Sequence, residues 1–197
     1  MEAHRQTEPT KPAPTVTRSH GPALPLPLLG LVVFAALVLG FVLLFRSHDS
    51  AKATLPPVGV PTAVSESQLK ALAAATDHPV YWAGPRKATY ELTRTTDGRI
   101  YVRYLPSSSE VGNQSPRYLT IGTYPTKQAF RAIQRAGARQ GGVAVKIDRG
   151  GLLVFNQATP KSVYFGYPKS AYQVEVFDPS PMQARALVLG GSVTAIH

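Results

Sequence analysis

The sequence predicts an α+β protein: an N-terminal transmembrane helix followed by a duplicated helix-plus-four-strand domain with mainly antiparallel sheet. Three observations predict it, namely an uninterrupted apolar run near the start, short strand-like runs between turn signals, and helix start signals that recur after residue 65. The chain has 197 residues, of which 44% are hydrophobic and only 16% charged. This composition excludes a disordered polyelectrolyte, and the length suits one ordinary domain with extensions.

Residues 21–45 predict a membrane anchor, because none of them is charged. As a helix, the apolar run 28–45 would span about 27 Å, close to the roughly 30 Å hydrocarbon core of a bilayer. A cleaved signal peptide is the nearest alternative, although this run is longer than a typical signal-peptide core. Basic residues are slightly more frequent before the run than directly after it, which favours a cytoplasmic N-terminus and an extracytoplasmic C-terminal domain in a single-pass cell-membrane protein.

The segments on either side of this anchor differ in composition from the rest of the chain. Residues 1–20 are polar and contain several prolines and threonines, which predicts a disordered tail. Residues 46–64 are rich in proline and alanine and predict a semi-extended linker. Residues 65–197 are numerous enough for a core without cross-links.

The absence of cysteine excludes disulfides, zinc–cysteine sites and thiol nucleophiles.

The expected elements of the domain follow from local signals along the chain. Ser65 and Gln68 form the capping box of a first helix, and Asp97-Gly98 predicts a hairpin turn. Thr126 caps a second helix that extends to about residue 139, and Ser180-Pro181 begins a third. Strands are expected at residues 80–82, 90–94, 100–104, 118–121, 143–147, 152–155, 163–165, 172–177 and 193–196.

The same order of signals occurs twice, which predicts an internal duplication. The three helices share the pattern [ST]-x-x-[QA]-apolar-[KR]-Ala-[LI], starting at Ser65, Thr126 and Ser180. A Gly-Gly pair opens a strand-like run after both the second and the third helix. The two units would cover about residues 65–125 and 126–191, with a final strand at 193–196, and would share one core.

Several runs after residue 78 resemble those of uncharacterised single-pass bacterial membrane proteins with a C-terminal α+β domain. They are VYWAGP, YELTRTTDGRIYVRYLP, TIGTYP and YQVEVFDPSP. The resemblance implies a membrane-anchored architecture in the bacterial envelope. It implies no activity, because none is established for those proteins.

The sequence carries few signs of catalytic chemistry. The motifs of phosphate-binding loops, dinucleotide sites, zinc proteases, serine esterases and calcium-binding loops are absent. His78 precedes Pro79 at a helix-to-strand turn, where a structural role is commoner than general-base catalysis. Glu91 and Glu175 lie on strands in corresponding units, so a carboxylate pair is the alternative to two exposed polar positions. We predict no catalytic residue, no metal ligand and no cofactor.

The clearest positive feature is a row of basic residues on the second helix. Lys127, Arg131, Arg135 and Arg139 recur at every fourth position and would follow one side of the helix. From Ser65 onward, 16 basic and 8 acidic residues give a formal charge of +8. The alternatives are a binding surface for an anionic partner and an ordinary solvated basic face.

The function expected from these features is that of an extracytoplasmic interaction module. The bilayer would hold residues 21–45, and the basic helix would contact anionic lipid, an envelope polymer or a protein. A binder of nucleic acid or another anionic polymer on the cytoplasmic side is the first alternative. The second alternative is an envelope hydrolase with a dispersed site, in which His78 would meet Asp148 or Glu175. Aromatic residues on the strands are able to stack on sugars or bases, although filling the core is their commoner role.

Overall fold

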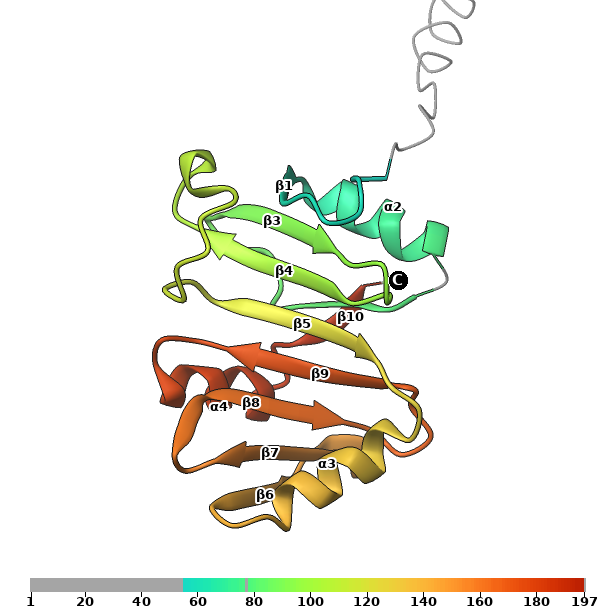
Figure 1. The fold of residues 1–197 in the computed structure, drawn as a ribbon, viewed down its shortest axis with the longest axis vertical. Coiled ribbons are helices and arrows are strands. Elements are labelled where there is room, and N and C mark those ends of the chain that lie inside the picture. Colours follow the sequence, from blue (N-terminus) through green and yellow to red (C-terminus); the bar gives the residue numbers. More distant parts are fainter. Residues whose placement is uncertain (1–54, 77, 197) are drawn as a thin grey trace, which may run out of the picture. The chain divides into compact units, whose positions relative to one another are not determined.

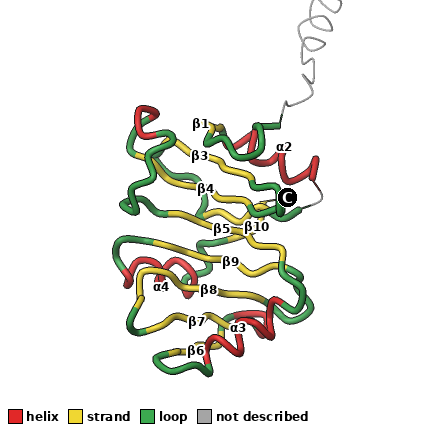
Figure 2. Tube along the Cα trace, in the orientation of Figure 1, coloured by secondary structure: helices red, strands yellow, loops and turns green. Residues whose placement is uncertain are grey.

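The computed structural model describes residues 55–76 and 78–196. This part of the chain is mainly antiparallel sheet with three helices, which confirms the α+β class (Figures 1 and 2). The predicted tail, residues 1–20, and the predicted anchor, residues 21–45, lie outside the described residues. No helix in the described part is long and apolar enough to cross a membrane.

Ten strands and three helices follow one another in the described part of the chain, with two short 3₁₀ turns between them. In chain order they are β1 (Thr62–Val64), α2 (Glu66–Thr76), β2 (Val80–Trp82), β3 (Thr89–Arg94), β4 (Ile100–Leu105), η1 (Ser108–Glu110), β5 (Thr120–Pro125), α3 (Ala129–Gly137), β6 (Gly142–Lys146), η2 (Asp148–Gly150), β7 (Leu152–Asn156), β8 (Thr159–Gly166), β9 (Tyr172–Phe177), α4 (Pro181–Leu189) and β10 (Thr194–Ile196).

Eight of these strands form one sheet in the order β1-β3-β4-β5-β9-β8-β7-β6, and β10 pairs with β2 in a separate ladder. Every neighbouring pair is antiparallel. The N-terminal strands β3–β5 meet the C-terminal strands β7–β9 at the β5–β9 ladder, where Gly122 pairs with Glu175.

One face of the large sheet is apolar because successive side chains in a strand point to opposite faces. The register places Leu92, Val102, Ile121, Val176 and Val163 in one row across five strands. All five have 0% of their surface exposed. This row forms the centre of the core.

The two faces of the sheet are covered unequally. Helices α2 and α4 and the β2–β10 ladder pack on the apolar face, where Leu72 of α2 and Leu187 of α4 belong to the same buried cluster. Helix α3 packs on the opposite face, over β6–β9, so that it lies in front of the sheet in Figure 1 while α4 and β10 lie behind it. Over β3, β4 and β5 the opposite face carries no helix of the described part.

Two of the predicted helix starts are confirmed in detail. The Ser65 amide donates to Gln68 Oε1 at 2.8 Å and the Gln68 amide donates to Ser65 Oγ at 3.2 Å, which is a complete capping box. Ser180 Oγ accepts a hydrogen bond from the Gln183 amide at 3.4 Å, and Pro181 is the first residue of α4.

Other expected boundaries need correction. Thr62–Val64, in the predicted linker 46–64, forms β1 beside β3, so the fold begins before Ser65. Thr126 does not cap the second helix, because Gln128 adopts a left-handed backbone conformation with a φ of 58° and α3 begins at Ala129. The strand expected at 118–121 is shifted to Thr120–Pro125.

Candidate functional site

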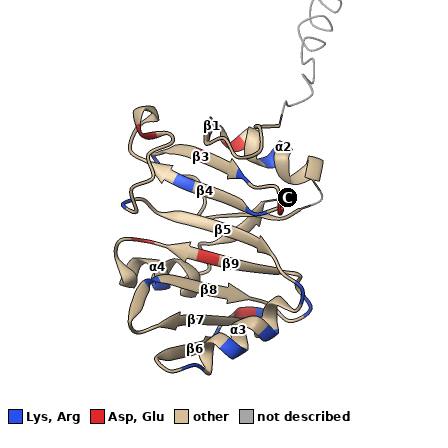
Figure 3. Ribbon diagram, viewed as in Figure 1, with Lys and Arg blue, Asp and Glu red and all other residues tan. Residues whose placement is uncertain are grey.

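The predicted basic residues are exposed, but they do not all lie on one helix. Arg131 and Arg135 are on α3, whereas Lys127 precedes the helix and Arg139 follows it. None of the four forms an ion pair within the described residues. Their side chains are therefore exposed without an ion-pairing acid among the described residues, and the blue segments of the ribbon in Figure 3 mark basic positions on α3.

The fold places a fifth basic residue close to the start of α3. Lys169, in the turn between β8 and β9, lines a shallow pocket of about 530 Å³ together with Arg131 and Gln128 at the start of α3. Its backbone is left-handed, with a φ of 67°. No sequence signal links residue 169 to residue 131, because only the return of the β8–β9 turn to the start of α3 brings them together.

The structure separates His78 from Glu175, one of the two carboxylates of the hydrolase alternative. His78 Nδ1 donates to the Pro79 carbonyl at 2.9 Å, and the imidazole ring contacts the Tyr172 ring edge-to-face at 4.7 Å. Tyr172 and Glu175 point to opposite faces of the sheet, since they are three residues apart on β9. His78 and Glu175 are thus on different sides of the sheet. Asp148 lies in η2 and lines a different pocket from Glu175. Within residues 55–76 and 78–196, no group of three potential ligands could hold a metal ion.

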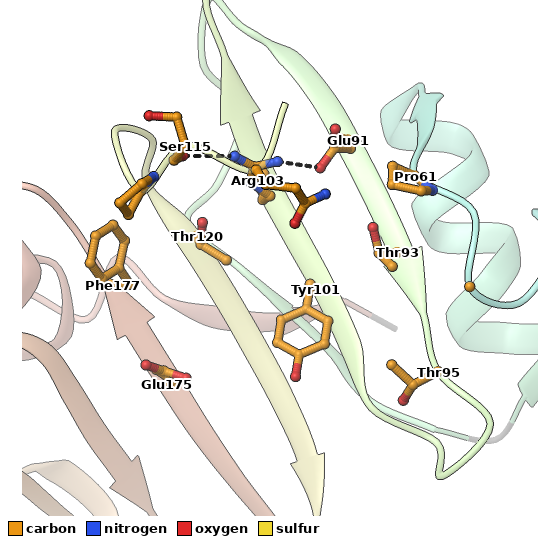
Figure 4. Close-up of a pocket in the computed structure, with 13 residues that line it drawn as sticks. Pro61, Glu91, Thr93, Thr95, Tyr101, Arg103, Ser115, Thr120, Glu175 and Phe177 are labelled. Carbon is orange, nitrogen blue, oxygen red and sulfur yellow. Dashed lines mark hydrogen bonds and ion pairs between the residues drawn. The ribbon is translucent and has the colours of Figure 1, made fainter. Parts of the chain in front are cut away.

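The half of the polar sheet face that α3 leaves open forms a pocket of about 580 Å³ (Figure 4). Its floor comes from β3, β4, β5 and β9, and residues 114–116 and Pro61 lie at its rim. Arg103 and Glu91 occupy one end, while Tyr101 and Glu175 lie toward the other end. Charged, hydroxyl and aromatic side chains therefore share one hollow surface.

At the first end, a buried ion pair holds a loop against the sheet. Arg103 Nη1 lies 2.8 Å from Glu91 Oε1, and the Glu91 side chain is 1% exposed. Glu91 Oε2 accepts a hydrogen bond from the Gly112 amide at 2.6 Å, and Arg103 Nη2 donates to the Ser115 carbonyl at 3.2 Å. Because both partners also bind the loop, this pair positions the pocket rim.

At the other end, Glu175 is surrounded by hydroxyl groups. Ser162 Oγ and Tyr164 Oη donate to Glu175 Oε1 at 2.7 and 3.1 Å, and Tyr124 Oη donates to Glu175 Oε2. Gly122, which pairs with Glu175, makes room for the Tyr124 ring. A Cβ on Gly122 would come within 2.8 Å of that ring.

The two glutamates lie on strands that are not neighbours and have different partners. The register puts Glu91 and Phe177 in one row across β3, β4, β5 and β9, and Glu175 two residues along β9. Three strand spacings and this offset separate the two glutamate Cα atoms by about 16 Å. The two carboxylates also share no partner. Glu91 binds Arg103 and the Gly112 amide, whereas Glu175 accepts hydrogen bonds from Ser162, Tyr164 and Tyr124. We therefore treat Glu91 and Glu175 as separate sites.

The tyrosines bound to Glu175 resist ionisation. Burial, followed by the charge of Glu175, raises the pKa of Tyr164 from 10.0 to about 12. Burial and the hydrogen bond to Glu175 raise the pKa of Tyr124 as well. Both phenols consequently stay protonated at neutral pH and serve as donors to the carboxylate.

We predict that Arg103→Met destabilises the fold by about 3–5 kcal/mol, because Glu91 is left as a buried charge without its partner. Adding Glu91→Gln should recover part of this loss. Chemical denaturation of the full chain measures both effects, with Arg117→Met as the control at an exposed arginine. A loss for Arg103→Met no larger than that for the control would contradict this role of the pair.

We also predict that Tyr164 contributes to alkaline sensitivity. Since its pKa is higher in the folded state, its stabilising contribution is complete below pH 10 and is lost as pH rises from 10 through about 12. Tyr164→Phe should therefore lose less stability over this interval than the unaltered chain. Denaturation curves across this range test the prediction, and equal losses in both proteins would refute it.

Comparisons with known proteins add no identification. No family model matches the chain, and neither a curated protein nor a solved structure is significantly similar to it. The resemblance to bacterial single-pass membrane proteins therefore stays a prediction, and the function has to be inferred from the geometry of the two surfaces described above.

Proposed function

We infer that this protein is a non-enzymatic interaction module, held at the outer side of the cell membrane by residues 21–45. Its basic surface, defined as Lys127, Arg131, Arg135, Arg139 and Lys169, would contact an anionic lipid surface, with an acidic envelope polymer or an acidic protein as the other candidate partners. The hydrolase alternative loses support, because His78 and Glu175 lie on opposite faces of the sheet.

The observation that carries this proposal is the uncompensated charge of the basic surface. Lys127, Arg131, Arg135 and Arg139 are exposed, and no described acid pairs with them. Between Glu110 and Asp148 the sequence contains no acid at all. Helix α3 needs only its other side for packing, where Ala129 and Ile133 are buried. The charges thus do not serve the stability of the helix against the sheet.

The proposed anchor would place this surface within reach of lipid headgroups. Residues 46–54 separate the anchor from the first described residue, and an extended segment of this length spans at most about 30 Å. Each basic residue close to an anionic membrane contributes about 1 kcal/mol to binding at low salt. Because α3 packs toward the β6 edge of the sheet, opposite β1, the basic surface would add lipid contacts to those of the anchor if the sheet lay along the membrane.

The internal duplication is a further part of the proposal. Strands β3–β5 and β7–β9 each form a three-stranded antiparallel sheet, and the two sheets join at β5 and β9. This strand order supports the division of the domain into two related units. Helices α2 and α3, which would be equivalent, pack on opposite faces, so one of them would have changed sides after duplication.

We predict that Arg131→Gln/Arg135→Gln weakens binding of residues 51–197 to anionic vesicles by about thirtyfold at low salt, since two charges worth about 1 kcal/mol each are removed. This fragment contains every strand pair and the whole buried cluster. Co-sedimentation with phosphatidylglycerol vesicles across a salt series measures the binding. Lys87→Gln/Arg117→Gln, which removes the same charge from exposed positions away from α3, is the matched control.

Two outcomes would overturn the proposal. Equal weakening by both double variants would mean that net charge alone matters, and salt-independent binding would remove the electrostatic mechanism. Reporter fusions at each terminus test the topology separately. A cytoplasmic C-terminus would favour the nucleic-acid alternative, in which affinity also falls steeply with salt.

A further inference from the structure

One carboxylate on the open half of the polar face has no cationic partner in the described part of the chain. Glu91 pairs with Arg103 at 2.8 Å, and Asp97, in the β3–β4 turn, pairs with Arg99 at 2.8 Å. Glu175 receives hydroxyl hydrogen bonds only. Of the three charged residues that line this pocket, Glu91 and Arg103 pair with each other, and only Glu175 lacks an ion-pair partner among the described residues.

The hydrogen bonds around Glu175 determine what it can still bind. A carboxylate offers about four lone-pair positions. Ser162 and Tyr164 use the two on Oε1, and Tyr124 uses one on Oε2, which leaves one free on Oε2. Because the three hydroxyl protons already point to Glu175, their oxygen atoms remain free only as acceptors. A ligand at this position has to supply the donors.

Aromatic side chains flank this acceptor cluster. Tyr101 and Phe177 line the same pocket as Glu175, and the Tyr101 and Tyr124 rings meet edge-to-face with centroids 5.7 Å apart. The Arg99 guanidinium already lies 5.7 Å from the centroid of the Tyr124 ring. Aromatic faces attract organic cations, most strongly where water is partly excluded.

From this arrangement we propose that the open pocket binds an aliphatic primary ammonium group, with Glu175 as its counter-ion. The ammonium donates to the free position on Glu175 Oε2 and to the surrounding hydroxyl oxygens, and its alkyl chain lies along Tyr101 and Phe177. A free amine and the side chain of a lysine in a peptide both carry this group. The site is opposite in charge to the basic surface and does not depend on the function proposed for that surface.

The test is an NMR titration of the isotope-labelled full chain in neutral detergent with n-butylammonium. The backbone amides of Gly122, Tyr124 and Glu175 should shift and reach saturation. The neutral isostere 1-butanol should leave them unchanged at the same concentrations. N-acetyl-lysinamide, titrated in parallel, separates the two sources, because it should shift the same amides only if the pocket admits a lysine side chain within a peptide.

Two variants assign the binding to the pocket. Glu175→Gln keeps the size of the side chain but removes its charge, and should weaken n-butylammonium binding by at least about tenfold. Tyr101→Leu leaves the carboxylate in place and should weaken n-butylammonium binding severalfold. This second variant keeps the proposal testable if Glu175→Gln does not fold. Asp148→Asn, with the same loss of charge at an exposed position in η2, should bind as the unaltered chain does.

The proposal is overturned if 1-butanol shifts the same amides equally, or if Glu175→Gln binds n-butylammonium as tightly as the unaltered chain. Saturable shifts with methyl glucoside in the absence of shifts with the amine would likewise overturn it in favour of a sugar site. Vesicle binding through α3 should be unchanged in Glu175→Gln, so failure of this proposal and failure of the proposed function are distinguishable.

Discussion

The constraint that shapes this protein is the unequal covering of one eight-stranded sheet. Side chains alternate between the two faces, so each strand contributes to both. In the described part of the chain, two helices and a two-stranded ladder bury the apolar face. On the opposite face only α3 packs, over β6–β8 and part of β9, and the rest of β9 stays open together with β3, β4 and β5. The open half of that face carries charged, hydroxyl and aromatic side chains together. A continuous aliphatic patch there would be exposed to water, which is rare on soluble domains.

Two glutamates on this polar face show how the surroundings give one residue type different roles. Glu91 is buried with Arg103 as its counter-ion and fixes the loop beside the pocket. Removing either partner leaves a buried charge, so the pair is a structural element. Among the described residues, Glu175 has hydroxyl donors and no ion-pair partner. The cross-strand neighbours account for this difference. Glu91 lies opposite Arg103, whereas Glu175 lies between Gly122 and Tyr164.

Local signals were sufficient to predict many elements but not the sites. The capping box at Ser65, the hairpin at Asp97-Gly98 and the start of α4 after Ser180 depend on residues close in sequence, and each is found in the structure. Helix α3 begins at Ala129 and not directly after Thr126, because the left-handed Gln128 gives no sequence signal. The sequence does not predict strand β1, because its three residues gain regular structure only by pairing with β3.

The sites were harder to predict because they depend on register. Glu91 and Glu175 were recognised as strand residues, but only the strand order shows that three strand spacings separate them. Lys169 joins Arg131 through the return of the β8–β9 turn. The basic residues around α3 were identified because charge and spacing are visible in sequence, and their exposure follows from the packing of Ala129 and Ile133 on the sheet.

Carboxyl labelling of the native full chain tests the unequal covering of the sheet most directly. Carbodiimide with glycine ethyl ester modifies accessible carboxylates, and mass spectrometry of the peptides gives a rate for each glutamate. We expect Glu175 to react and Glu91, 1% exposed, to remain protected until the chain is unfolded. Equal protection of both residues would mean that something covers the polar half-face, and equal reaction of both would mean that the buried ion pair does not form.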